Sequence, residues 1–171
     1  MNRYLKQVGE FHTTFSHPLN YEVIDDANLR KLRISLLFEE LKELSQTSKE
    51  TFTHFQELCS NLEDTEVAEQ YDEKEALDAL CDIQYVLSGA VLSMGFTRKF
   101  DHAFEEVHRS NMTKACETEQ QGLDTIEYHK GRGETMEMEV VKSGDLFIVV
   151  REDGKIMKSK YYSPANLDKF S

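Results

Sequence analysis

"LLFEELKEL", residues 36–44, places three glutamates among closely spaced leucine and phenylalanine residues. Apolar residues recur at helical spacing around this stretch, and Asp25 or Asp26 offers an N-cap, so residues 28–46 are predicted to form a helix. Because successive helical residues turn by about 100°, Glu39, Glu40 and Glu43 share one arc of its surface. Such a patch on its own is most simply a solvated helix face.

A second acidic helix weakens that simple interpretation. Residues 72–96 are apolar after the first two turns and should end near Gly95. Glu75, Asp78 and Asp82, at i, i+3 and i+7, share a narrow arc of this helix. Unpaired carboxylates beside apolar residues are costly, so two such helices packed face to face would need cations between them. Oxygen ligands without His or Cys favour Mg²⁺, with Mn²⁺ as a possible substitute.

The rest of the chain predicts a mainly helical fold with a small β appendage. Helical spacing is also found in residues 4–19, where Pro18 should stop the helix, and in residues 98–112. A further short helix is possible in residues 50–58. Residues 116–134 are polar and fit either a loop or a weak helix.

Short β-like runs separated by the turn formers "SGD" and "EDG" predict an antiparallel meander at residues 137–160. We therefore expect an all-α domain, which contains both acidic motifs, at residues 1–116. A C-terminal extension, residues 117–171, should carry the meander and pack on the same domain.

Composition restricts the partners of the protein. The chain has 171 residues, 39% of them hydrophobic, and 32 acidic against 20 basic residues give a net charge of −12. This charge repels nucleic acids and anionic membranes. The charged N-terminal residues do not resemble a signal peptide, and no apolar run approaches the ~18 residues of a membrane span, so a cytoplasmic protein is expected.

Several motifs together resemble the all-α nucleoside triphosphate pyrophosphohydrolases, which include MazG, the dimeric dUTPases and phosphoribosyl-ATP pyrophosphohydrolase. "EELKE" at 39–43 and "EALD" at 75–78 are similar to the EExxE and ExxD motifs of that superfamily. "FHTTFSHPLN", "EEVHRSNMTK" and "EDGKIMKSKYYSPANL" resemble further segments of its MazG-like branch. The resemblance covers residues 8–116 and 151–167, which leaves residues 117–150 as an insertion.

The resemblance implies a MazG-like helical bundle, usually a homodimer, that hydrolyses nucleotides between the α and β phosphates. The products are a nucleoside monophosphate and pyrophosphate, and the role is removal of unwanted nucleotides. By motif position, Glu39 or Glu40 is the general base. Mg²⁺ would be held by the motif acids Glu40, Glu43, Glu75, Asp78 and Asp82, so Glu40 is a candidate for both roles. Asp78 and Asp82 remain alternatives for the main ligand on the second helix.

The resemblance also suggests which residues contact the nucleotide. Arg109, Asn111 and Lys114 lie in "VHRSNMTK", although Asn111 could instead cap a helix and Lys114 could be solvated. Lys155 and Lys158 are weaker candidates from "DGKIMK", because hairpin tips commonly carry lysine.

Two residues near the N-terminus could shape a pocket for the nucleobase. His12 can form a hydrogen bond with a base, and the ring of Phe15 can stack on one. The alternative for Phe15 and its neighbour Phe11 is ordinary core packing at i, i+4 spacing.

Two other functions fit parts of the pattern. A di-iron carboxylate bundle needs a Glu-x-x-His motif on each of two helices, and Glu105 with His108 supplies it once. A non-enzymatic helical module could instead use the acids to recruit a basic partner.

Overall fold

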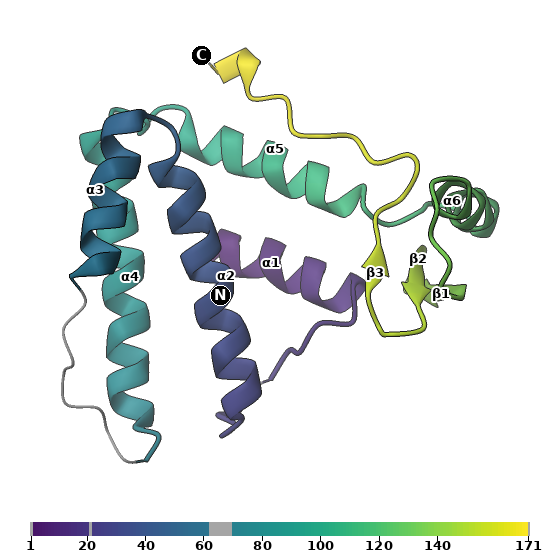
Figure 1. The fold of residues 1–171 in the computed structure, drawn as a ribbon, viewed down its shortest axis with the longest axis horizontal. Coiled ribbons are helices and arrows are strands. Elements are labelled where there is room, and N and C mark those ends of the chain that lie inside the picture. Colours follow the sequence, from purple (N-terminus) through teal and green to yellow (C-terminus); the bar gives the residue numbers. More distant parts are fainter. Residues whose placement is uncertain (1, 21, 62–69, 171) are drawn as a thin grey trace. The chain divides into compact units, whose positions relative to one another are not determined.

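The computed structural model describes residues 2–20, 22–61 and 70–170, and within them the fold is mainly helical with a small C-terminal sheet, as predicted (Figure 1). The α-helices are α1 (Arg3–Thr14), α2 (Ala27–Ser45), α3 (Lys49–Ser60), α4 (Glu73–Ser93), α5 (Phe100–Met112) and α6 (Glu119–Gly131). The strands are β1 (Met138–Ser143), β2 (Leu146–Arg151) and β3 (Ile156–Met157), and a 3₁₀ turn, η1 (Asp168–Phe170), follows.

The chain forms two compact units. One comprises Met1–Asn20 and Ile83–Ser171, and the other comprises Tyr21–Asp82. The division falls inside α4, so that helix contributes residues to both units.

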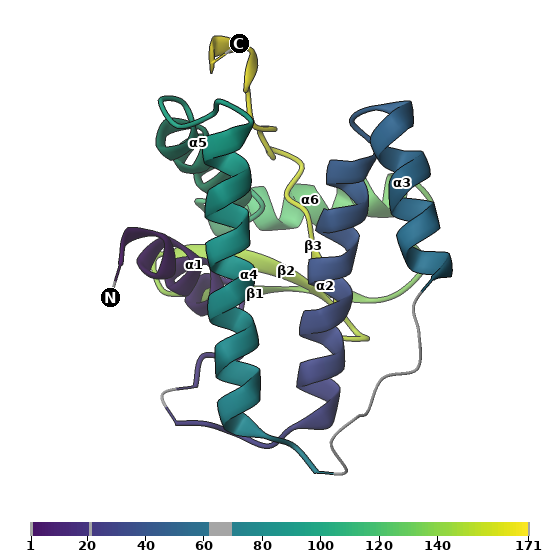
Figure 2. The same cartoon turned by 90° about the vertical axis from the view of Figure 1, so that its left-hand side faces the viewer.

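The unit Tyr21–Asp82 is built from α2, α3 and the beginning of α4. The Asp26 carboxylate caps α2, and the Ser48 hydroxyl caps α3, as expected for short side chains that accept hydrogen bonds from free backbone N–H groups. Helices α2 and α3 lie side by side in Figures 1 and 2, and the Phe38 and Phe55 rings are 5.5 Å apart between them. Asp72 accepts hydrogen bonds from the first turn of α4.

In the other unit, α1 packs against α5 through aromatic side chains. The Tyr4 ring lies edge-on to the rings of Phe100 and Phe104, at 6.3 and 4.5 Å. Helix α1 ends at Thr14, and two residues later Ser16 adopts a positive φ of 54°. The helix thus stops close to the predicted region, but before Pro18 is reached, so the proline itself does not terminate it.

The hydrophobic core of this unit lies where α1 and the segment after α5 meet the sheet. Phe15, Ala115 and Ile148 are buried against one another. Half-buried apolar residues pack around them, namely Phe11, Met112, Val141, Leu146, Val150 and Ile156. Segments distant in the sequence are therefore joined by one small apolar cluster.

The sheet is an antiparallel meander in the order β1-β2-β3, as the turn residues predicted. Gly144 and Gly154 occupy the two turns with φ of 59° and 84°, a region that favours glycine. Within residues 116–134, for which a loop or a weak helix was considered, Glu119–Gly131 form helix α6, which the Thr118 side chain caps. Gly122 allows α6 to approach β1, where it packs on Val140.

We predict that Gly122→Ala destabilises the protein, although alanine normally stabilises a helix interior by about 1 kcal/mol relative to glycine. The added Cβ would lie 2.6 Å from Cγ1 of the stiff, β-branched Val140. Overpacking of this kind costs about 1–3 kcal/mol, measurable by urea denaturation. Gly131→Ala in the same helix has open space around the new Cβ and is the control. A Gly122→Ala protein as stable as wild type would contradict the prediction.

A second prediction concerns acid stability of the turn after β2. The Arg151 guanidinium forms two hydrogen bonds with Asp153 and holds the pKa of that carboxyl at about 2. Because the unfolded pKa is higher, about 3.9, the ionised form stabilises the folded state above that pH, and the contribution is lost as the pH falls towards 2. We expect Asp153→Asn to reduce the fall in thermal midpoint between pH 5 and 2.

The control for this measurement is Asp145→Asn in the other turn of the sheet. The Asp145 carboxylate forms no ion pair with the residues that the structure describes. Identical pH profiles for wild type and Asp153→Asn would show that the Arg151 contact contributes nothing to stability.

Candidate functional site

The six motif carboxylates all belong to the unit Tyr21–Asp82. Glu39, Glu40 and Glu43 lie on α2, and the other three, Glu75, Asp78 and Asp82, lie on α4. All six side chains are exposed. None of these carboxylates forms a hydrogen bond or ion pair with another described residue. They are therefore free to bind a ligand as far as their own contacts are concerned.

The chemistry of these donors fits Mg²⁺, because all six are hard carboxylate oxygens. Their arrangement in the single chain does not form a metal site. Within residues 2–20, 22–61 and 70–170, no three His, Cys, Asp or Glu side chains are grouped so that they could hold one metal ion. The expected carboxylate cleft therefore stays a prediction.

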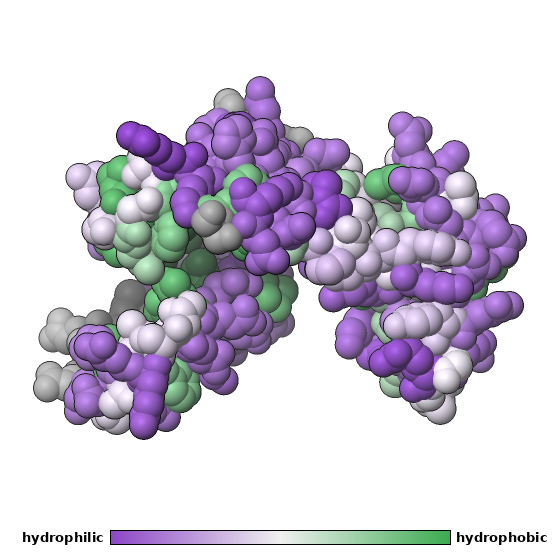
Figure 3. All heavy atoms as spheres, turned by 90° about the horizontal axis from the view of Figure 1, so that it is seen from above, coloured by the Kyte–Doolittle hydropathy of each residue, from purple (hydrophilic) through white to green (hydrophobic). Residues whose placement is uncertain are grey.

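The acidic helices also carry many apolar side chains on their surfaces. Figure 3 shows hydrophobic residues, in green, on the molecular surface. On α2 the large exposed ones are Leu32, Ile34, Leu36, Leu37, Phe38, Leu41 and Leu44, and on α4 they are Leu77, Leu80, Ile83, Tyr85, Val86, Leu87 and Leu92. Helices that are apolar around most of their circumference are normally buried, so a single chain leaves these two helices incompletely covered.

By length and composition alone, α4 could cross a membrane, and it is the one such helix in the described part of the chain. Asp78 and Asp82 lie within it. Carboxylates inside a bilayer are costly, so the apolar surface of α4 is better explained by contact with protein.

The two N-terminal candidates lie in different environments. Phe15 is 2% exposed and belongs to the core, as the alternative interpretation held, so its ring is not free to stack on a base. His12 is half-buried, and its Nδ1 lies 2.8 Å from the carbonyl oxygen of Pro18. Beside them, the Phe11 ring stacks on His17 at 5.6 Å.

The candidates near the end of α5 are also held by neighbours. Arg109 donates two hydrogen bonds to Glu106, at 2.8 and 3.0 Å, and one to the carbonyl of Pro164. The Lys114 ammonium lies 5.6 Å from the centre of the Phe11 ring. Asn111 is half-buried in the last turn, but the C-cap is Thr113, so the alternative in which Asn111 caps the helix is wrong.

The two lysines of the C-terminal segment are exposed. Lys155 lies in the turn between β2 and β3, and its backbone N–H donates to Asp153. The Lys158 ammonium lies over the Tyr162 ring at 4.1 Å from its centre. Neither ammonium group forms an ion pair with a described carboxylate.

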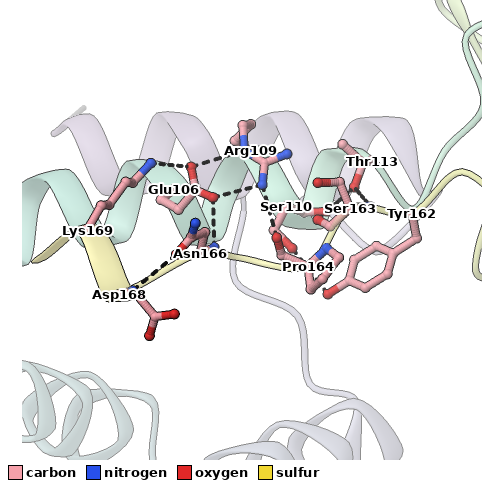
Figure 4. A network of polar contacts seen from close by, with 10 residues as sticks. All are labelled: Glu106, Arg109, Ser110, Thr113, Tyr162, Ser163, Pro164, Asn166, Asp168 and Lys169. Carbon is pink, nitrogen blue, oxygen red and sulfur yellow. Dashed lines mark hydrogen bonds and ion pairs between the residues drawn. The ribbon is translucent and has the colours of Figure 1, made fainter. Parts of the chain in front are cut away.

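The sequence did not indicate that the C-terminal residues 159–170 lie along α5, an arrangement we call the clasp (Figure 4). Glu106 is at its centre and is 8% exposed. Hydrogen bonds from Arg109, from the Asn166 backbone and from Lys169 hold the pKa of Glu106 well below its usual range. The polar residues at 106, 110 and 113, spaced along one face of α5, are the signal that could have predicted this contact.

The residues of the di-iron alternative have other partners. Glu105 pairs with Arg3 of α1, and His108 lies 3.2 Å from the Glu10 carboxylate. The two side chains are thus engaged between α1 and α5.

Comparison with known proteins adds independent information. The family model for phosphoribosyl-ATP pyrophosphohydrolase matches residues 8–111. An uncharacterized protein of Acanthamoeba polyphaga mimivirus is 35% identical over 71 residues, which are 39% of this chain. The match spans only 28% of the length of that viral protein. No solved structure matches the chain.

Proposed function

Because the chain belongs to the phosphoribosyl-ATP pyrophosphohydrolase family, within the all-α nucleoside triphosphate pyrophosphohydrolases, we propose that it cleaves nucleoside triphosphates between the α and β phosphates. The products are a monophosphate and pyrophosphate, and the role is removal of unwanted nucleotides. The observation that carries the proposal is the family match, because residues 8–111 include both acidic motifs.

The motif acids would perform the hydrolysis. Glu39 or Glu40 accepts the proton of the attacking water. Glu40, Glu43 and Glu75, with Asp78 or Asp82, would hold Mg²⁺. Once bound, the ion supplies positive charge to the phosphate oxygens. The support for these roles is that all six carboxylates are exposed and lack partners among the described residues.

A few basic and polar residues are proposed to bind the nucleotide. An anionic substrate needs cations in a protein of net charge −12. Lys114, Lys155 and Lys158 have no carboxylate partner in the described part of the chain, which supports contacts with phosphate. Asn111 is proposed to contact a phosphate or the sugar, and His12 is proposed to contact the base.

We further propose that a second copy of the chain covers the apolar faces of α2 and α4. Exposed groups of large apolar side chains mark protein interfaces, and α2 and α4 each expose seven of them. Burial by a like chain would also bring more acidic motifs into one assembly, which supports a homodimer as the active form.

The catalytic proposal is tested with a panel of nucleoside tri- and diphosphates and Mg²⁺, in which pyrophosphate is distinguished from orthophosphate. We expect pyrophosphate and a monophosphate, and a fall in kcat of roughly 10²–10⁴-fold in Glu40→Gln, the loss typical of a general base. Glu50→Gln, on α3 and outside both motifs, should retain activity. Absence of turnover across the panel, with Mg²⁺ bound, would contradict the proposal.

The dimer is tested by sedimentation at micromolar concentration. We expect a species of twice the chain mass of 19.8 kDa. Val86→Glu, which places a charge among the exposed apolar residues of α4, should shift it to the single-chain mass. Val23→Glu makes the same change at an exposed position outside the helices and should leave the dimer intact. A wild-type protein of single-chain mass would refute the dimer.

A further inference from the structure

Glu106 is the one charged side chain that is buried among the residues that the structure describes. Its two carboxylate oxygens accept hydrogen bonds from Arg109, from the backbone N–H of Asn166 at 2.9 Å and from Lys169 at 2.9 Å. Charge-assisted bonds of this number can offset the cost of burying a carboxylate. Glu106 therefore ties α5 to the last turn of the chain.

The contacts continue along the same face of α5 towards its C-terminal end (Figure 4). The Ser110 hydroxyl donates to the Tyr162 hydroxyl at 3.1 Å. One turn later, Thr113 accepts a hydrogen bond from the Ser163 backbone N–H at 2.9 Å. The clasp thus contacts successive turns of α5 from Glu106 to the C-cap residue Thr113.

The last contact lies beside the proposed substrate-binding residues. The backbone N–H of Ser159 donates to the carbonyl oxygen of Lys114 at 3.0 Å. The segment from Asn111 to Lys114 therefore has a clasp contact on its N-terminal side, at Ser110, and further contacts at Thr113 and Lys114. The position of this segment depends on the clasp, and Glu106 holds the C-terminal part of the clasp through Asn166 and Lys169.

We propose that Glu106 is a positioning residue, which acts through the clasp to hold Asn111 and Lys114 in the conformation that binds the nucleotide. The inference rests on the proposed function for the identity of the ligand. It also changes the role of Arg109, which serves the clasp through Glu106 and Pro164.

The test compares Glu106→Gln with Glu105→Gln in the full-length protein. Both variants remove one negative charge from adjacent positions, but the Glu105 carboxylate pairs with Arg3 outside the clasp. We expect Glu106→Gln to accelerate amide hydrogen exchange in residues 111–116 and 159–167. We also expect it to raise KM several-fold for the best nucleotide of the panel, with a much smaller change in kcat. Glu105→Gln should resemble wild type in both measurements.

A second variant, Thr113→Val, removes the hydroxyl that accepts the Ser163 hydrogen bond without a change in charge, and should raise KM in the same way. Unchanged exchange, or unchanged KM in either variant of an active protein, would overturn the positioning role alone. A wild-type protein that hydrolyses no nucleotide of the panel would overturn the proposed function, and the positioning role with it. If Glu106→Gln does not fold, the result for Thr113→Val decides.

Discussion

Burial of the Phe15 ring connects the parts of the larger unit. This ring packs with Ala115 and Ile148, so one apolar contact joins the end of α1, the segment after α5 and the central strand β2. The core around it is small, and other large apolar side chains of the unit remain on the surface. Polar contacts must therefore supply part of the order that a larger core would give. The hydrogen bonds of the clasp along α5 and the ion pairs of Arg151 supply these polar contacts.

Local sequence signals predicted most elements because each element carries its own boundary residues. Asp26 acts through capping, and Gly144 and Gly154 act through a positive φ, all within a few residues of their own position. The exception is α6. Its sequence is polar enough to fit a loop, and its close packing on β1 requires a residue without a Cβ at Gly122. Contacts of that kind depend on residues distant in sequence, which a local pattern does not contain.

The same distinction applies to the candidate site. Helical periodicity correctly predicted that both acidic motifs lie on helices, because a turn of about 100° per residue is a local property. It could not show whether α2 and α4 bring their acids together, since this depends on how their apolar faces are covered. For Phe15, the local pattern allowed two roles, and burial in the core decided between them. The interaction of Glu106 with Asn166 and Lys169 links residues about 60 positions apart, so the polar residues spaced along α5 could indicate a contact there but not its partners.

The hydrogen bond between Ser159 and Lys114 has a consequence for how this chain could change in evolution. It brings Lys114 and Ser159 together, so that α6 and the sheet form an inserted segment whose two ends are adjacent. By connectivity alone, such an inserted segment could be lengthened, shortened or exchanged with little effect on the rest of the fold. The buried contact of Ile148 with Phe15 removes part of that freedom. Variation in length should therefore be tolerated in the outer turns around Gly144 and Gly133, whereas β2 must be kept to shield the ring.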